Sequence, residues 1–352
     1  MKTLEISSPS KKYNVCIGEG LLSRTGERVR ALLPSAEKAA IITDDNVDGL
    51  WSEKVVSSLE EAGFEVFKYV LPHGEESKNG LNYLAILSFL AENRLSRSDV
   101  LLAIGGGMVG DIAAFSAATY LRGIKYIQLP TSLLAMVDSS VGGKTAIDLP
   151  AGKNLAGTFC QPEMVLCDTD TLTTLPKEIF RDGCAEVLKY GILGDRELFA
   201  HLKEKGTDFD REYVISASVE MKSKYVCADE FDTGIRRMLN LGHTVGHAVE
   251  KLSGFSLSHG KSVAIGTAII ARAAVKAGRC SAECAEEIVS VLKMLALPTE
   301  TELGIDALMP VMLSDKKREG SAVNVIVPLG IGQSEIVPMK EAELKEFVSK
   351  GL

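Results

Sequence analysis

The chain has 352 residues, of which 46% are hydrophobic and 24% charged, a composition typical of a globular protein. At this length two domains are expected, because a single hydrophobic core rarely grows so large. The formal net charge of −8 leaves no basic surplus to neutralise phosphates, which argues against nucleic acid as a partner.

Signals for export and for membrane insertion are also missing from the sequence. Residues 1–10 lack the apolar core of a secretion signal, and no stretch approaches the ~18 consecutive apolar residues of a membrane-spanning helix. The seven cysteines contain no C-x-x-C pair, which argues against a disulfide framework or a thiolate zinc site. We therefore expect a reduced, cytoplasmic protein with no membrane partner.

The first half of the chain alternates short apolar runs with amphipathic stretches. This alternation predicts βαβ units and a mostly parallel sheet. The expected strands are residues 39–43, 65–71, 100–104 and 125–129, and the expected helices are residues 46–62, 79–93 and 109–121.

Beyond Pro176 the pattern changes to long helical periodicity, so we place a domain boundary near residues 170–176. The expected domains are an α/β domain at 1–172 and a mainly helical domain at 173–352. The predicted helices are 177–192, 211–229, 234–252, 259–277 and 281–295, and a small hairpin is predicted at 322–327 and 334–337.

A glycine-rich turn follows the strand at 100–104 and reads G-x-G-x-x-G from Gly105 to Gly110. Glycines let the backbone approach a diphosphate, and a helix N-terminus offers free N–H groups to it. The motif predicts a dinucleotide site, although it lies outside the first βα turn and lacks an acidic residue about twenty positions later. Asp44, after the strand at 39–43, could hold a ribose instead. The alternative is a tight turn without a ligand.

Three of the five histidines lie between residues 243 and 259. His243 and His247 are four apart and so share a helix face, and neutral imidazole is a common ligand of divalent metals. Thr244 stands where a zinc protease has its glutamate, which excludes that class. Two zinc sites remain open, one of His243, His247 and Glu250, the other of His243, His259 and a remote carboxylate. Structural histidines are the alternative to both.

Basic side chains precede the histidines. Arg236 and Asn240 continue the spacing of His243 and His247, which predicts one polar stripe along a single helix. Such a stripe suits an anionic ligand, and a solvated helix face is the alternative.

Other polar groups carry weaker signals. The stretch 138–145 resembles a phosphate loop but has Asp138 in place of the first glycine, so it is no triphosphate site. Lys144 and residues 153–154 could still bind a phosphate or a carboxylate. Glu186 and Lys189 are three apart on a predicted helix, where a surface ion pair is the plain interpretation.

Taken together, these stretches resemble the 3-dehydroquinate synthases of the sugar-phosphate cyclase family. The matches run in family order along nearly the whole chain, at residues 74–78, 105–111, 129–132, 138–145, 152–154, 181–189, 239–250, 259–260 and 315–317. The resemblance implies a Rossmann-like NAD-binding domain followed by a mainly α-helical metal- and substrate-binding domain. It also implies that Zn²⁺ or Co²⁺ is held by Glu186, His243 and His259, with His247 contacting the substrate.

The resemblance implies further contacts. Those with NAD fall on Asp44, His73, Gly74, Glu75, Glu76, Ser77, Lys78, Gly107, Met108, Val109, Gly110, Asp111, Thr131, Ser132, Asp138, Lys144, Lys153, Thr171, Leu172, Thr173 and Thr174. Those with an anionic sugar-phosphate substrate fall on Asp138, Lys144, Asn154, Lys189, Lys222, Arg236, Asn240, His247 and one of Lys316 and Lys317. Arg122 matches an arginine that reaches the neighbouring subunit's site, which implies a homodimer.

Two residues depart from the family pattern. His73 stands where Asp or Pro is commoner, and Lys261 places a positive charge beside His259. Neither replaces an implied metal ligand.

The implied reaction converts 3-deoxy-D-arabino-heptulosonate 7-phosphate into 3-dehydroquinate and phosphate, a step of aromatic amino-acid biosynthesis in the shikimate pathway. It combines transient oxidation by NAD, phosphate elimination, re-reduction, ring opening and aldol closure. The alternatives are a metal-dependent polyol dehydrogenase, a sister cyclase that makes a carbasugar, and a non-catalytic NAD-binding protein.

Overall fold

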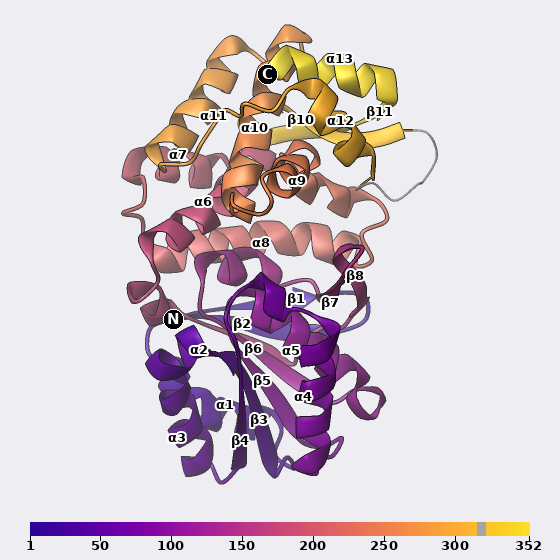
Figure 1. The fold of residues 1–352 in the computed structure, drawn as a ribbon. Helices are drawn as coiled ribbons and strands as arrows, with labels where there is room; N and C mark the ends of the chain where they lie inside the picture. Colours follow the sequence, from indigo (N-terminus) through magenta and orange to yellow (C-terminus); the bar gives the residue numbers. More distant parts are fainter. Residues whose placement is uncertain (315–321) are drawn as a thin grey trace. The chain divides into compact units, whose positions relative to one another are not determined.

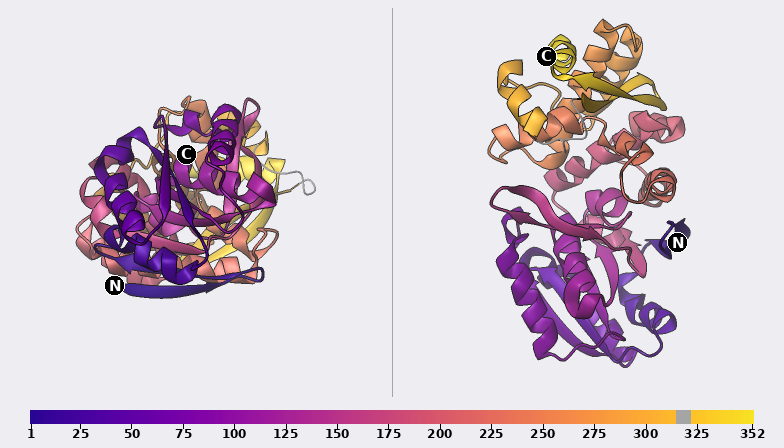
Figure 2. Two further views of the ribbon diagram at one scale, coloured as in Figure 1. Left: turned by 90° about the horizontal axis from the view of Figure 1, so that it is seen from below. Right: turned by 90° about the vertical axis from the view of Figure 1, so that its right-hand side faces the viewer.

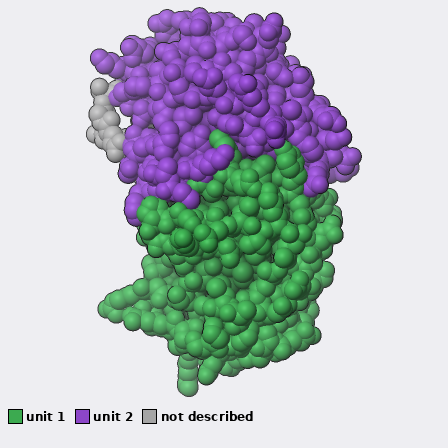
Figure 3. Space-filling model, turned by 180° about the vertical axis from the view of Figure 1, so that it is seen from behind, with its two compact units in different colours: residues 1–176, 211–223 green, residues 177–210, 224–352 purple. Residues whose placement is uncertain are grey.

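The computed structural model describes residues 1–314 and 322–352 (Figure 1). The chain divides into two compact units, residues 1–176 with 211–223 and residues 177–210 with 224–352 (Figure 3). The longer segment of the first unit ends at Pro176, and the boundary that the sequence suggests lies near residues 170–176. Residues 211–223, which begin the helix α8 (Arg211–Ala228), lie with the first unit and not with the helical part.

A seven-stranded sheet forms the centre of the first unit. Every pair of neighbouring strands is parallel except β1 and β2. The four predicted strands are confirmed, whereas the N-terminal hairpin and β9 were not predicted. In spatial order the strands are β1 (Lys2–Ser7), β2 (Lys12–Gly18), β9 (Met164–Asp168), β6 (Lys125–Pro130), β5 (Val100–Gly105), β3 (Lys38–Asp44) and β4 (Glu65–Leu71).

Helices cover both faces of this sheet (Figures 1 and 2). Val100, Leu102 and Ile104 of β5 belong to the core that includes α1 (Thr25–Leu32) and α3 (Glu53–Glu61). The alternate residues Leu101 and Ala103 pack toward α4 (Gly80–Glu92) and α5 (Gly107–Thr119). Burial on both faces is why β5 is a continuous apolar run.

The strand order indicates at which edge of this sheet a ligand can bind. From β3 the chain passes outward to β4, then returns to β5 on the other side of β3 and continues through β6 to β9. Loops at the carboxyl ends of β3 and β5 therefore leave in opposite directions, and such a switch point opens a crevice in parallel sheets. The glycine-rich turn follows β5 at this edge.

The second unit is mainly helical. Its core joins α9, α10, α12 and α13 to a two-stranded sheet. The described helices are α6 (Lys177–Leu193), α7 (Arg196–Lys205), α9 (His243–Leu252), α10 (His259–Lys276), α11 (Ala282–Met294), α12 (Ile305–Ser314) and α13 (Glu341–Gly351), and the strands are β10 (Ala322–Gly330) and β11 (Gln333–Lys340).

One helix prediction is wrong. Residues 234–252 form a short 3₁₀ helix η7 (Ile235–Asn240) and a separate helix α9, because Gly242 between them has a φ of +78°. The other predicted helices of this unit and the hairpin are confirmed, whereas α7, α12 and α13 were not predicted. Among the described helices none has the length and apolar character that crossing a membrane requires.

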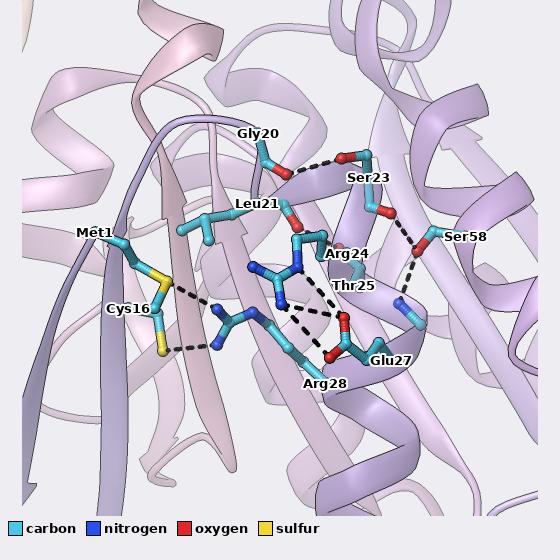
Figure 4. A network of polar contacts seen from close by, with 11 residues as sticks. Met1, Cys16, Gly20, Leu21, Ser23, Arg24, Thr25, Glu27, Arg28 and Ser58 are labelled. Atoms are coloured by element: carbon cyan, nitrogen blue, oxygen red, sulfur yellow. Dashed lines mark hydrogen bonds and ion pairs between the residues drawn. The ribbon is translucent and has the colours of Figure 1, made fainter.

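A tight contact joins α1 to α3 in the first unit. The Ser58 hydroxyl accepts a hydrogen bond from the Gly26 N–H at 2.9 Å and donates one to the Ser23 carbonyl at 2.9 Å (Figure 4). A Cβ on Gly26 would lie 1.8 Å from the Ser58 carbonyl oxygen. The two helices therefore approach this closely only because residue 26 has no side chain.

Gly26→Ala is expected to destabilise the protein by about 1–3 kcal/mol, because α1 must move away from α3 to admit the methyl group. Urea unfolding measures the change. Gly49→Ala is the matched control, since a Cβ there meets nothing within 4 Å. Equal stability of the two variants would contradict the contact.

Candidate functional site

Most of the predicted nucleotide contacts lie in loops that follow strands of the first unit's sheet. Asp44 ends β3 and its carboxylate accepts hydrogen bonds from the backbone N–H groups of Asn46 and Val47, both at 3.0 Å. Burial raises its pKa. Thr131 and Ser132 follow β6, and Thr171, Leu172 and Thr173 lie in η6 (Thr169–Thr173) after β9.

The glycine-rich turn leaves the first turn of α5 open. Gly106 is the N-cap of α5 and offers no side chain to the first N–H groups of the helix. Uncapped N–H groups at a helix N-terminus favour an anion. A Cβ on Gly105 would lie 2.7 Å from the Val109 side chain, so the turn needs glycine there too.

Lys78 forms a buried ion cluster beside that turn. It is 3% exposed, and its ammonium lies 2.8 Å from Glu75 and 3.2 Å from Asp111. Burial lowers the pKa of Lys78, but the carboxylates of Asp111, Glu75 and Asp148 outweigh it and raise the pKa. Burial raises the pKa of Asp111 to about 6 although Lys78 opposes it. The structure thus brings together Glu75, Lys78 and Asp111, three residues that were predicted to contact NAD.

Other predicted NAD residues are less closely grouped. His73 bonds through its ring Nδ1 and its backbone N–H to Asp45 Oδ1, both at 2.8 Å. Lys153 belongs to the hairpin of β7 (Lys144–Leu149) and β8 (Gly152–Phe159) and is half-buried.

The predicted substrate residues of the first unit form one close pair. The Lys222 ammonium donates to the Asp138 carbonyl at 2.6 Å and also contacts its carboxylate. Lys144 and Asn154 lie toward opposite ends of the β7–β8 hairpin, because Lys144 pairs with Phe159 and Asn154 with a φ of +56° follows the turn. The structure therefore brings Asp138 and Lys222 together but keeps Lys144 apart from Asn154.

Three helices of the second unit supply a compact group of metal-ligand atoms. Glu186 Oε1 on α6 lies 3.5 Å from His243 Nε2 on α9 and 3.3 Å from His259 Nε2 on α10. All three ligand atoms lie within 4.8 Å of one another. Two donors that each bind a tetrahedral metal at about 2.1 Å are about 3.4 Å apart. The separations therefore fit one divalent ion.

Close packing of α9 on α10 determines how near the imidazoles of His243 and His259 lie to each other. A Cβ on Gly242 would lie 2.2 Å from Thr267 Oγ1, and one on Gly266 would lie 2.0 Å from the Gly242 carbonyl oxygen. Small residues at this crossing let the helix backbones approach. The rings of His243 and His259 consequently have their centroids 5.3 Å apart.

The electrostatics of this group favour a cation. Glu186 is 1% exposed and lies 2.5 Å from the Lys189 ammonium. Burial lowers the pKa of His243 to about 3, which keeps that imidazole neutral, as a metal ligand must be. Burial also lowers the pKa of His259, but Glu186 and Glu250 outweigh it and raise the pKa to about 10. A cation between His259 and Glu186 would replace that proton.

The remaining ring nitrogens have their own partners. His243 Nδ1 lies 2.9 Å from the Leu241 carbonyl, and His259 Nδ1 lies 3.4 Å from Glu250 Oε2. Such partners orient imidazole ligands of metals. The geometry thus favours Glu186 as the carboxylate of the group, with Glu250 behind His259. His247 lies beside the group, its ring centroid 5.3 Å from that of His243.

The predicted stripe of four residues on a single helix is wrong. Arg236 and Asn240 lie on η7, and the break at Gly242 separates them from His243 and His247. Arg236 is 2% exposed, and its Nη1 donates to the Glu230 carbonyl at 2.5 Å. Lys316 and Lys317 lie outside the described residues.

Sequence reasoning missed two contacts around His259. The Asp182 carboxylate accepts hydrogen bonds from Ser258 and from the Lys261 N–H, the latter at 2.9 Å. The Lys261 ammonium forms an ion pair with Glu178 at 2.7 Å, so its charge is directed to that carboxylate. The signal in the sequence was Asp182 itself, a hydrogen-bond acceptor that lies one helical turn before Glu186 on a predicted helix.

Two family models of known proteins match adjoining parts of this chain. A family model described as 3-dehydroquinate synthase N-terminal matches residues 68–182, and one described as 3-dehydroquinate synthase C-terminal matches residues 183–318. A 3-dehydroquinate synthase from Streptococcus suis is 42% identical over an alignment that covers 98% of this chain and 99% of that protein.

Solved structures share the fold over the whole chain. A 2-deoxy-scyllo-inosose synthase complexed with carbaglucose-6-phosphate, NAD+ and Co²⁺ has a TM-score of 0.89 at 21% identity, with 100% of both chains covered. A 2-epi-5-epi-valiolone synthase from Streptomyces hygroscopicus with NAD+ and Zn²⁺ has a TM-score of 0.87 at 24% identity, with 99% of this chain and 98% of that chain covered.

The geometry predicts how single substitutions change cation binding. Glu186→Gln and His259→Ala are each expected to weaken Co²⁺ binding by more than about 100-fold, beyond the loss that outer partners cause. His247→Ala is the control and is expected to leave the affinity nearly unchanged, because its ring is a neighbour of the donor group and not a member. Competition with a chromophoric chelator measures the constants. An equal loss in His247→Ala would place His247 among the ligands.

Proposed function

Because this chain belongs to the 3-dehydroquinate synthase family, we propose that it converts 3-deoxy-D-arabino-heptulosonate 7-phosphate into 3-dehydroquinate and phosphate. The observation that carries the proposal is the group formed by Glu186, His243 and His259, with the His247 ring beside it. A carbon–oxygen lyase of this kind needs a cation for the substrate hydroxyls and polar side chains next to it.

Two bound groups would supply the chemistry that side chains lack. NAD would accept and return a hydride, and a divalent metal would act as a Lewis acid toward two hydroxyls of the substrate. Glu186, His243 and His259 would hold Zn²⁺ or Co²⁺, the ions named with the two structural neighbours. NAD would lie at the sheet edge that carries Asp44, the Lys78 cluster and the open N-terminus of α5.

The chain's own residues would bind and orient an anionic substrate. We assign its phosphate and carboxylate to cationic and amide side chains, since a dianion needs such partners even in an acidic protein. The described members are Lys144, Asn154, Lys189, Lys222, Arg236 and Asn240. Asp138 would hold the Lys222 ammonium in place.

Lys189 and His247 would act next to the metal group. The Lys189 ammonium shares the buried Glu186 carboxylate, so it balances charge there and orients that ligand. The His247 imidazole is half-buried beside His243 and can accept or donate a proton at the substrate without being a ligand. His247→Ala should therefore slow turnover while metal binding persists.

A turnover assay tests the proposed reaction. With the heptulosonate phosphate, Co²⁺ and NAD far below the substrate concentration, we expect one phosphate and one 3-dehydroquinate per substrate consumed, with no lasting NADH absorbance. The reason is that the hydride returns to the product in every cycle. A polyol dehydrogenase would instead accumulate NADH with glycerol.

Two further outcomes would contradict the substrate assignment. Turnover of a hexose or heptulose phosphate without a carboxylate would identify a sister cyclase. Absence of turnover with any of these substrates, in protein that binds metal and NAD, would leave a non-catalytic role. Glu186→Gln is the matched inactive control.

We also propose a cytoplasmic homodimer in which Arg122 serves the neighbouring subunit's site. Its side chain is exposed at the end of η4 (Tyr120–Arg122), and its backbone has a φ of +64°. An exposed arginine on a left-handed turn is suited to contact a group on a neighbouring subunit.

Mixed dimers test the role of Arg122. Arg122→Ala and Glu186→Gln are each expected to be inactive alone. Equal amounts refolded together should regain about a quarter of wild-type activity, because half of the dimers are mixed and each has one complete site. No recovery, or a monomer by sedimentation, would contradict the shared site.

A further inference from the structure

Helix α10 begins with the proposed metal ligand His259, and its N-terminus is capped by a different helix. Ser258 is the N-cap residue, but its side chain accepts no hydrogen bond from the helix N-terminus. The Asp182 carboxylate on α6 takes that place and accepts from the Lys261 N–H at 2.9 Å. It also accepts from the Ser258 hydroxyl. One carboxylate oxygen therefore holds the residues on both sides of His259.

Steric contact at the same point fixes the position of α10 along α6. A Cβ on Gly260 would lie 2.0 Å from the Asp182 carbonyl oxygen, so the two backbones touch beside the cap. The first N–H groups of a helix lack partners within the helix and carry partial positive charge, so a carboxylate stabilises this end doubly. Asp182 is half-buried, which reduces screening by water.

Asp182 and Glu186 are four residues apart on α6 and so lie on one helix face. Glu186 contributes a carboxylate to the metal group, while Asp182 contributes the cap of the helix that presents His259. The separation of 3.3 Å between Glu186 Oε1 and His259 Nε2 therefore depends on two neighbouring positions of a single helix.

We propose that Asp182 is a positioning residue that sets His259 against Glu186 and thereby determines the affinity and geometry of the metal site. This inference rests on the metal site of the proposed function. Asp182 does not touch the ligand atoms. It acts through the backbone of residues 258–261. Residues that do not bind a metal commonly orient its ligands in this way.

A second contact between the same helices contributes less. Lys261 and Glu178 form an ion pair at 2.7 Å, but the Glu178 side chain is 69% exposed. Exposed pairs of this kind contribute little, because water screens them and both side chains lose freedom. Glu178→Gln therefore breaks an α6–α10 contact near His259 without touching the cap.

The test compares Asp182→Ala, Asp182→Asn and Glu178→Gln with the wild-type chain. Chelator competition gives the Co²⁺ dissociation constant, and the visible absorption of bound Co²⁺ reports ligand geometry. Asp182→Ala is expected to weaken Co²⁺ binding about 10- to 100-fold and to change the absorption bands. Asp182→Asn keeps an oxygen acceptor and should recover most of the affinity, and Glu178→Gln should match wild type.

Each outcome decides the inference. Wild-type affinity and spectrum in Asp182→Ala would overturn it, and so would equal losses in all three variants, which would indicate general loosening of α10. If the wild-type chain itself binds no Co²⁺, the proposed function fails first and this inference fails with it. Thermal unfolding of the metal-free proteins checks folding. Should Asp182→Ala not fold, Ser258→Ala removes one of the two hydrogen bonds and is expected to weaken binding less.

Discussion

The second unit is organised around one buried carboxylate. Glu186 is 1% exposed, and a charge so far from water is costly unless opposite charges or hydrogen-bond donors surround it. Lys189 lies one helical turn away on α6, and the imidazoles of His243 and His259 arrive from two other helices. Removing Lys189 or His259 leaves the carboxylate less compensated, whereas the neutral His243 imidazole needs a cation between its Nε2 and Glu186. The group is therefore cooperative, and a bound cation would complete it.

That group exists because three helix backbones approach unusually closely. Gly242 and Gly266 bring α9 against α10, and Gly260 brings α10 against α6. Larger side chains at these crossings would push the helices apart and move the imidazoles away from Glu186, although no ligand residue would be changed. Packing and chemistry are thus specified by different residues, and glycines that bind nothing are required for the site.

Much of the fold was predictable because its signals are local. Strands β3 and β5 are buried, largely apolar runs between helices, and the glycine-rich turn marks the edge at which nucleotides bind in parallel sheets. The place of the N-terminal hairpin beside β9 was not predictable, because β2 and β9 are about 150 residues apart in the chain. The helix predicted at 234–252 was wrong because Gly242 is helical by pattern but is held at a positive φ by the contact with Thr267.

For the candidate site, the sequence by itself determined the kinds of ligand and their family resemblance. Histidine spacing alone left Glu250 and a remote carboxylate as equal candidates. Spacing reports neighbours within one helix, whereas Glu186 meets His243 and His259 through the packing of three helices. Tertiary structure therefore placed Glu250 behind His259, His247 beside the group and Asp182 at the start of α10. Those positions depend on backbone contacts between distant segments, and no local pattern of side chains encodes them.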